Sequence, residues 1–164
     1  MSFQTRINQY LPIGVEGDFA SDNPVSSWLA GEGALVAGDD GVTVGRFAWA
    51  DADNMTAANT GTGAPHGFVS REGQALITDW MGNASMVIPA GMAVDLKTRG
   101  DFVVKTTTAA TIGQKIFANL TDGTISTGAA GATIAGSVET IFTVGSAGAA
   151  NELIKMGTWG NSYA

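Results

Sequence analysis

Hydrophobic residues follow a short, regular pattern over most of the chain. From residue 39 onward they fall in short runs rich in β-branched and aromatic side chains, with turn residues between the runs. Such runs predict β-strands, because these side chains pack well on a pleated surface. The predicted strands and hairpins occupy residues 42–49, 68–77, 86–91, 93–99, 102–108, 116–127, 138–144 and 152–159.

Turn residues predict where several of these strands reverse. The 68–77 run is expected to turn at Glu72-Gly73, and Pro89 with Gly91 marks a further turn. The clearest hairpin is 116–127, where Asp122-Gly123 suits the positive φ angles of a tight primed turn. Roughly eight strands at intervals near ten residues predict a β-sandwich or β-barrel, with the strand order left open.

Residues 1–38 carry a different pattern. Proline and glycine interrupt this segment too often for a long helix or strand, so residues 3–10 and 24–29 are expected to form a helical turn or two at most. Its many apolar side chains still need a partner surface, which is either the protein's own body or another molecule. We therefore expect an extended N-terminal arm at 1–38 and a β-structured body at 39–164.

Composition narrows the classes of function. Only 14% of the 164 residues are charged, while 45% are hydrophobic and 23 are glycine, so the chain is not disordered by composition. There is no cysteine for disulfides or thiolate metal sites. A net charge of −7 disfavours direct nucleic-acid binding, because phosphates would repel the chain. No apolar run is long enough to span a bilayer and no secretory signal begins the chain, so we expect cytoplasmic synthesis and no membrane partner.

Catalytic and metal-binding motifs are weak. His66 is the single histidine, and no Gly-x-Ser-x-Gly sequence accompanies it. Asp51, Asp53 and Asn54 resemble the start of a calcium loop, but Thr56 and Thr62 stand where an EF-hand needs glycine and glutamate. No phosphate-binding glycine motif is present. We expect no enzyme activity, no cofactor and no metal site.

Several sequence phrases resemble tailed-bacteriophage capsid cement (decoration) proteins. They lie at residues 3–24, 45–51, 87–92 and 113–123, and Val15 to Pro24 is the most distinctive phrase. The resemblance implies a mainly β fold, either a small β-barrel or a jelly-roll-like sandwich, with the extended N-terminal arm. It also implies a virion protein on the capsid exterior that bridges neighbouring major capsid proteins and stabilises the expanded, DNA-filled shell. Partners would be the major capsid protein and sister copies, in a homo-dimer or homo-trimer.

The arm supplies the candidate capsid-binding residues. They are Phe3, Ile7, Tyr10, Leu11 and Ile13, with Arg6 as a polar partner.

Three alternatives remain open at this stage. The first is a carbohydrate-binding or adhesive β-sandwich of a phage tail or fibre that uses Trp49, Trp80 or Trp159, although core or interface packing is the commoner use of tryptophan. The second is a hydrolase that uses His66. The third is a monomer whose N-terminal segment packs on its own body.

Overall fold

The computed structural model describes residues 13–72 and 85–159. Predictions for residues 1–12, 73–84 and 160–164 lie outside this range, among them the helical turn at 3–10 and the turn of the 68–77 hairpin. The described residues form only strands, turns and loops, with no helix. The thirteen strands are β1 (Ser26–Ser27), β2 (Val36–Ala37), β3 (Val42–Thr43), β4 (Phe47–Ala50), β5 (Thr56–Ala58), β6 (Gly67–Val69), β7 (Val87–Ile88), β8 (Leu96–Arg99), β9 (Asp101–Lys105), β10 (Lys115–Asn119), β11 (Ile125–Gly128), β12 (Ser137–Val144) and β13 (Leu153–Gly157).

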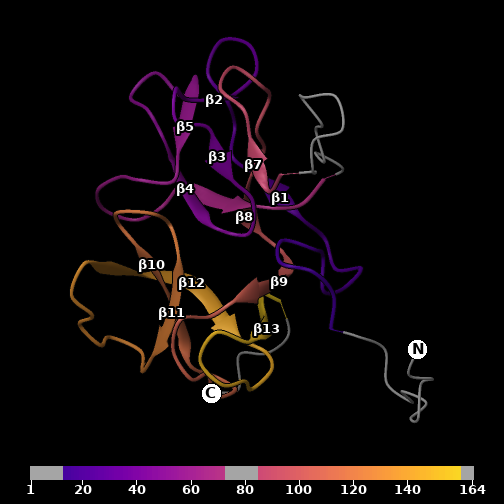
Figure 1. The fold of residues 1–164 in the computed structure, drawn as a ribbon, viewed down its shortest axis with the longest axis vertical. Coiled ribbons are helices and arrows are strands. Elements are labelled where there is room, and N and C mark those ends of the chain that lie inside the picture. The colour runs from indigo at the N-terminus through magenta and orange to yellow at the C-terminus, as the bar shows by residue number, and fades with distance from the viewer. Residues whose placement is uncertain (1–12, 73–84, 160–164) are drawn as a thin grey trace, which may run out of the picture.

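The strands form two main sheets and one small one (Figure 1). One sheet has six strands in the order β1-β8-β6-β4-β5-β2, and the other has five in the order β11-β10-β12-β13-β9. Strands β3 and β7 make a two-stranded sheet beside the six-stranded one. The described strands make no closed barrel, so of the two predicted architectures the sandwich-like one is the fold of this chain.

The inner strands β4 and β6 of the six-stranded sheet are buried on both faces. In β4, Phe47 and Trp49 join the larger hydrophobic cluster, whereas Ala48 between them joins the smaller one. In β6, Phe68 and Val69 divide in the same way. Successive side chains of a strand point to opposite faces, so a strand with core on both sides reads as a continuous apolar run. This explains why the sequence Phe-Ala-Trp-Ala is buried almost throughout.

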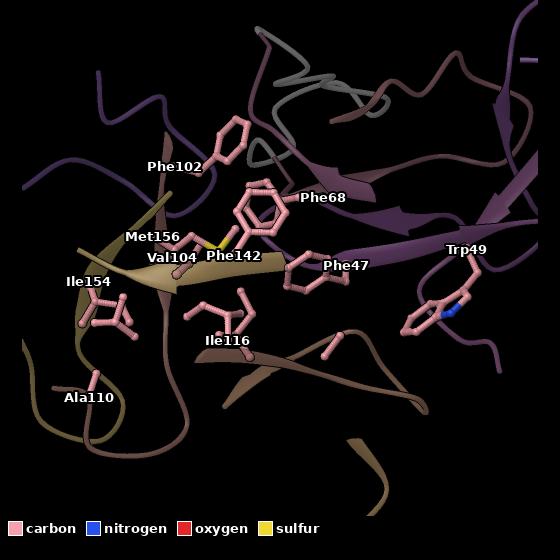
Figure 2. Packing of buried hydrophobic residues seen from close by; sticks show 13 residues of the cluster. Phe47, Trp49, Phe68, Phe102, Val104, Ala110, Ile116, Phe142, Ile154 and Met156 are labelled. Atoms are coloured by element: carbon pink, nitrogen blue, oxygen red, sulfur yellow. The ribbon is translucent and has the colours of Figure 1, made fainter. Parts of the chain in front are cut away.

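Aromatic side chains join the two main sheets (Figure 2). The ring of Phe47 lies 5.6 Å from Phe142 on β12 and 5.7 Å from Phe68 on β6. Phe68 in turn lies 4.8 Å from Phe102 on β9. Each such pair contributes about 0.5–1.5 kcal/mol beyond its burial. Residues from both sheets therefore form one continuous core.

The predicted strand at 42–49 is wrong in one respect, because it is two strands. Val42 in β3 pairs with Ile88 of β7, whereas Phe47 in β4 pairs with Phe68 of β6. A turn around Gly45 redirects the chain between these two partners. The helical turn expected at 24–29 is also wrong, since β1 pairs there with β8.

The hairpin at 116–127 is confirmed, but its turn is not the primed type. Strands β10 and β11 pair antiparallel, with Ala118 opposite Ile125. The connection holds five residues, 120–124, and the N–H of Gly123 donates to the carbonyl of Asn119 at 2.9 Å. Gly123 has a φ of 68°, while Asp122 does not adopt positive φ as a primed turn requires. A Cβ at Gly123 would also meet the carbonyl oxygen of Phe47, so glycine is required on two grounds.

Candidate functional site

The N-terminal segment pairs with the edge of the five-stranded sheet, where Phe19 and Phe102 form an isolated antiparallel β-bridge. The N–H of Gly17 donates to the carbonyl of Val103 at 2.8 Å, and the N–H of Val103 donates to the carbonyl of Asp18 at 2.8 Å. Ala20 continues the pattern with a 2.8 Å bond to the carbonyl of Asp101. An uncovered sheet edge invites pairing with other chains. Residues 17–20 cover this one.

The same segment is fixed to the six-stranded sheet. The carbonyl of Gly17 accepts a hydrogen bond from the N–H of Arg71 at 2.8 Å, and the Arg71 guanidinium lies 3.2 Å from the Asp18 carboxylate. Gly17 has a φ of 89°, and a Cβ there would lie 2.7 Å from the side chain of Val44. The close approach of three chain segments therefore requires glycine at this position.

The chain then crosses the junction between the sheets (Figure 1). Ser21 and Asn23 donate to one carboxylate oxygen of Asp101, at 2.7 and 2.6 Å. The indole N–H of Trp159 donates to the carbonyl of Pro24 at 2.6 Å. Val25 follows, half-exposed, directly before β1. Residues 21–24 and Trp159, the last described residue, thus meet where β8 passes into β9.

An ion network holds β1 against β8. The Lys97 ammonium lies 2.5 Å from Asp95 and 2.6 Å from Glu72, and the Ser27 hydroxyl donates to Asp95 at 2.9 Å. Burial opposes the charge of Lys97, but hydrogen bonds and the negative charges of Asp95 and Glu72 outweigh it and raise the pKa of Lys97. The N-terminal segment is therefore anchored by charge as well as by backbone pairing.

The predicted capsid-binding residues fall at the start of this segment. Phe3, Arg6, Ile7, Tyr10 and Leu11 lie outside the described residues. Ile13 lies within them and is 37% exposed. The structure shows further exposed apolar side chains on the same segment, which are Val15, Phe19, Val25, Trp28 and Leu29. Leu29 has the highest exposure of this group, 86%.

A groove of about 500 Å³ opens beside Trp28, between the two main sheets. Trp28, Pro65 and His66 line one side, and β12 lines the other with Glu139 and Ile141. Phe47 and Phe142 of the core contribute to its lining as well. Ile141 is 57% exposed although it lies in the middle of a strand. Sequence reasoning missed this groove, because its lining residues are scattered along the chain.

A β-bulge shapes the β12 side of the groove. Lys115 of β10 pairs with Thr143, while Phe117 pairs with Glu139, so residues 140–142 of β12 lie opposite Ile116 alone and β12 holds two extra residues there. The Thr140 hydroxyl donates to the carbonyl of Ile116 at 2.9 Å and accepts from the N–H of Phe142 at 3.3 Å. A bulge re-aims side chains relative to a regular strand. Here the exposed side chain within the bulge is Ile141.

His66 has a structural hydrogen bond. Its Nδ1 accepts from the N–H of Ala50 at 2.9 Å, so the proton of the neutral ring lies on Nε2. The ring also packs edge-on against Trp28, with 4.6 Å between ring centres. Because Nδ1 is engaged with backbone, a carboxylate cannot orient the ring there as in a catalytic triad. These contacts favour a packing role for His66 over the hydrolase alternative.

The acidic cluster at 51–54 also has a structural explanation. Asp51 accepts from the Thr56 hydroxyl at 2.7 Å and from the N–H of Met55 at 2.8 Å, closing the β4–β5 turn. The Thr56 hydroxyl bond and the N–H bonds of Met55 and Thr56 lower the pKa of the Asp51 carboxyl. Within residues 13–72 and 85–159, no group of three or more His, Asp or Glu side chains is arranged to hold a metal ion.

The tryptophans of the carbohydrate-binding alternative have different environments. Trp49 is buried in the larger cluster and donates to the carbonyl of Gly63 at 3.1 Å. Trp159 is partly exposed, under the guanidinium of Arg99 at 5.9 Å. Trp80 lies outside the described residues. The described tryptophan that borders the groove is instead Trp28, whose indole N–H donates to Asn54.

A second, smaller pocket of about 210 Å³ holds an unusual carboxyl group. Glu16 lies there, half-buried, with Arg46 and Lys105 nearby. Burial raises the pKa of Glu16, and the positive charges of Arg46 and Lys105 offset only part of that effect.

In the described parts of the chain, no helix is long and apolar enough to cross a membrane.

One family model matches nearly the whole chain. The model of the XM1 gp53 minor capsid protein family matches residues 3–158. Among solved structures, a chain from the capsid of the Myoviridae phage XM1 matches with a TM-score of 0.58 and 18% sequence identity. That match covers 96% of this chain and 98% of the phage chain, and at this identity it shows a shared fold. No curated protein sequence gives a significant match.

Proposed function

The chain belongs to the XM1 gp53 minor capsid protein family, and from that premise we propose that it is a capsid cement protein. Membership gives it a structural role in a bacteriophage capsid and a place in the virion. The proposal goes further. The protein binds the outer surface of a tailed-phage capsid, bridges neighbouring major capsid proteins and stabilises the expanded, DNA-filled shell.

The observation that carries the proposal is the extent of the family match. It spans residues 3–158, so it includes the N-terminal segment as well as the β-structured body. The phrases that resemble cement proteins fall within the same span. The segment from Ile13 to Leu29 is also fixed to both sheets while several of its apolar side chains stay exposed. A rigid segment with exposed apolar anchors suits a lasting protein–protein contact.

Mass action supplies the stabilising mechanism. A protein that binds only the closed, expanded shell lowers the free energy of that state relative to disrupted states. Attachment at many symmetry-related positions strengthens the effect without requiring a tight single contact. A copy that contacts two capsid subunits would also resist their separation. The activity needed is mechanical, and no chemical step is involved.

Self-association fits the same role. Only 14% of the residues are charged, and exposed apolar side chains occur on the N-terminal segment and on β12. Such a surface suits coverage by sister copies and by the shell. Closed symmetry allows either a homo-dimer at two-fold positions or a homo-trimer at three-fold positions.

Reconstitution on undecorated shells tests the proposal. The purified protein is mixed with expanded capsids that lack it, and electron microscopy locates the added density. We expect density on the outside of the shell at a seam between major capsid proteins, and higher heat resistance of the shell. Failure to bind, or density on the inner surface, would overturn the proposal.

Deletion of residues 1–12 tests the predicted contact residues. It removes Phe3, Arg6, Ile7, Tyr10 and Leu11 but keeps residues 17–20, which cover β9. We expect loss of shell binding with the fold intact. Unchanged binding of the shortened protein would show that these residues are not the anchor.

A further inference from the structure

The groove beside Trp28 has the size of a ligand-binding site. Its volume of about 500 Å³ lies within the usual range for ligand sites, roughly 300–1,000 Å³. Trp28, Pro65 and Ile141 offer apolar contact area, and Thr98 and Thr140 are among the polar residues of the lining. Trp28 is partly exposed, and tryptophan is enriched among the anchors at the centre of protein interfaces; the exposed Ile141 lies across the groove from it.

Part of β12, the strand beside the groove, lacks partner strands. In the described part of the chain, residues 140–142 have no partner in the β12 ladder with β10, and β12 pairs with β13 only at Thr143 and Val144. Thr140 uses its hydroxyl to satisfy Ile116 and Phe142, which fixes the shape of the bulge. An extended segment beside a strand that lacks partners is one of the recurring modes of peptide recognition.

The charges that border the groove restrict which kind of segment can bind in it. One cation, Lys115, and one carboxylate, Glu139, border the groove, so their formal charges cancel. The groove therefore has no net charge to attract a strongly basic or acidic segment, and an apolar wall would penalise a buried charge. An uncharged, apolar, extended segment matches it best.

The position of the groove points to the source of that segment. Trp28 lies at the end of the N-terminal segment that the proposed function places against the capsid, and the strongly exposed Leu29 follows it. The groove is therefore continuous with the proposed contact surface. We propose that it receives an extended, uncharged, apolar segment of the major capsid protein. This inference rests on the proposed function and adds a second, separate contact to that of residues 1–12.

Paired charge substitutions test the groove. Ile141→Asp places a carboxylate in the groove, and Ile112→Asp makes the same change at a matched site, 54% exposed, that does not line it. Binding to undecorated expanded shells is measured by co-sedimentation. We expect at least a tenfold loss of affinity for Ile141→Asp and less than a twofold change for Ile112→Asp. Equal effects of the two substitutions, or none, would overturn the inference.

Cysteine footprinting gives a second readout that does not depend on a disruptive change. The chain has no cysteine, so Ile141→Cys introduces a unique thiol. We expect a maleimide to label it quickly in the free protein and at least ten times more slowly on shells. Equal labelling in both states would refute occupancy by a capsid segment. Protection in the free protein at high concentration would refute it too, because a second copy would then fill the groove.

Failure of this inference is distinguishable from failure of the proposed function. If the wild-type protein binds shells while Ile141→Asp binds equally well, the cement role stands and the groove has no part in it. If the wild-type protein does not bind shells, the proposed function itself fails.

Discussion

At the scale of single residues, glycines and one carboxyl group show how tightly the segments meet. Gly17 lies where the N-terminal segment, Val44 and Arg71 converge, and a side chain there would have no space. Glu16, the residue before Gly17, is half-buried beside Arg46 and Lys105. Burial raises its pKa, so its charged form costs stability at neutral pH.

Glu16→Gln should therefore stabilise the protein at neutral pH. Because the pKa of Glu16 is raised in the folded state, its protonation stabilises the fold, and this stabilisation is complete below the unfolded-state pKa near 4.5. The stabilisation is lost as the pH rises through the folded-state pKa. Removing the titrating group should raise the melting temperature at pH 7. The gain in unfolding free energy should be less than about 1 kcal/mol, because the group is half exposed. The gain should vanish below pH 4.

Thermal unfolding followed by circular dichroism at pH 7 and pH 3.5 measures both effects. Glu32→Gln serves as a control at an exposed position, with little change expected at either pH. A lower melting temperature for Glu16→Gln at pH 7 would mean that attraction to Arg46 and Lys105 outweighs the burial cost.

At the scale of elements, partners remote in the sequence decide what local pattern cannot. The hairpin at 116–127 and the turn at Pro89 are predictable, because adjacent residues determine them. The break at Gly45 depends on two different partner strands, and the pairing of residues 17–20 depends on β9, far along the chain. No local signal in the broken 13–20 segment separates a segment paired with a sheet edge from a free arm.

The groove had one readable signal. Along β12, Thr140 and Phe142 are buried, whereas the intervening positions are Glu139, Ile141 and Thr143. An isoleucine among polar residues on the outward face is the exception that marks a contact surface. Its partners Trp28 and His66 could not be assigned to it from sequence, because only the fold brings those loops together.

Deletion of residues 1–20 should destabilise the body, unlike deletion of residues 1–12. The longer deletion removes four backbone hydrogen bonds, which link Gly17 with Val103 and Arg71, Asp18 with Val103, and Ala20 with Asp101. At about 1 kcal/mol each, the loss is near 4 kcal/mol, a large part of the stability of an ordinary domain. It also exposes the edge of β9, so aggregation should increase.

Chemical denaturation and light scattering compare the two deletions. We expect a lower midpoint and visible aggregation for the 1–20 deletion alone. Equal stability of both shortened proteins would mean that the pairing of residues 17–20 with β9 contributes little to the fold.

At the scale of the whole molecule, low charge density and exposed apolar side chains belong together. The chain carries 8 basic and 15 acidic residues, and ion pairs such as Lys97 with Asp95 and Glu72 use part of that charge inside the protein. The surfaces proposed to meet the capsid instead carry exposed apolar side chains, several of them between Ile13 and Leu29 and one at Ile141. A contact of this composition should depend on water exclusion rather than on charge attraction.

Salt should therefore affect shell binding weakly. Salt screens the interaction between exposed charges that lie farther apart than about 10 Å at 0.1 M and about 3 Å at 1 M. The burial of apolar surface does not depend on this screening. Arg6 is the single charged side chain among the six predicted contact residues, so it alone offers a screened attraction. We expect the affinity for undecorated shells to change less than threefold between 0.05 and 0.5 M sodium chloride, measured by co-sedimentation. A fall of tenfold or more would identify charge complementarity with an oppositely charged shell as the main attraction, and the apolar anchors would then serve chiefly to orient the bound protein.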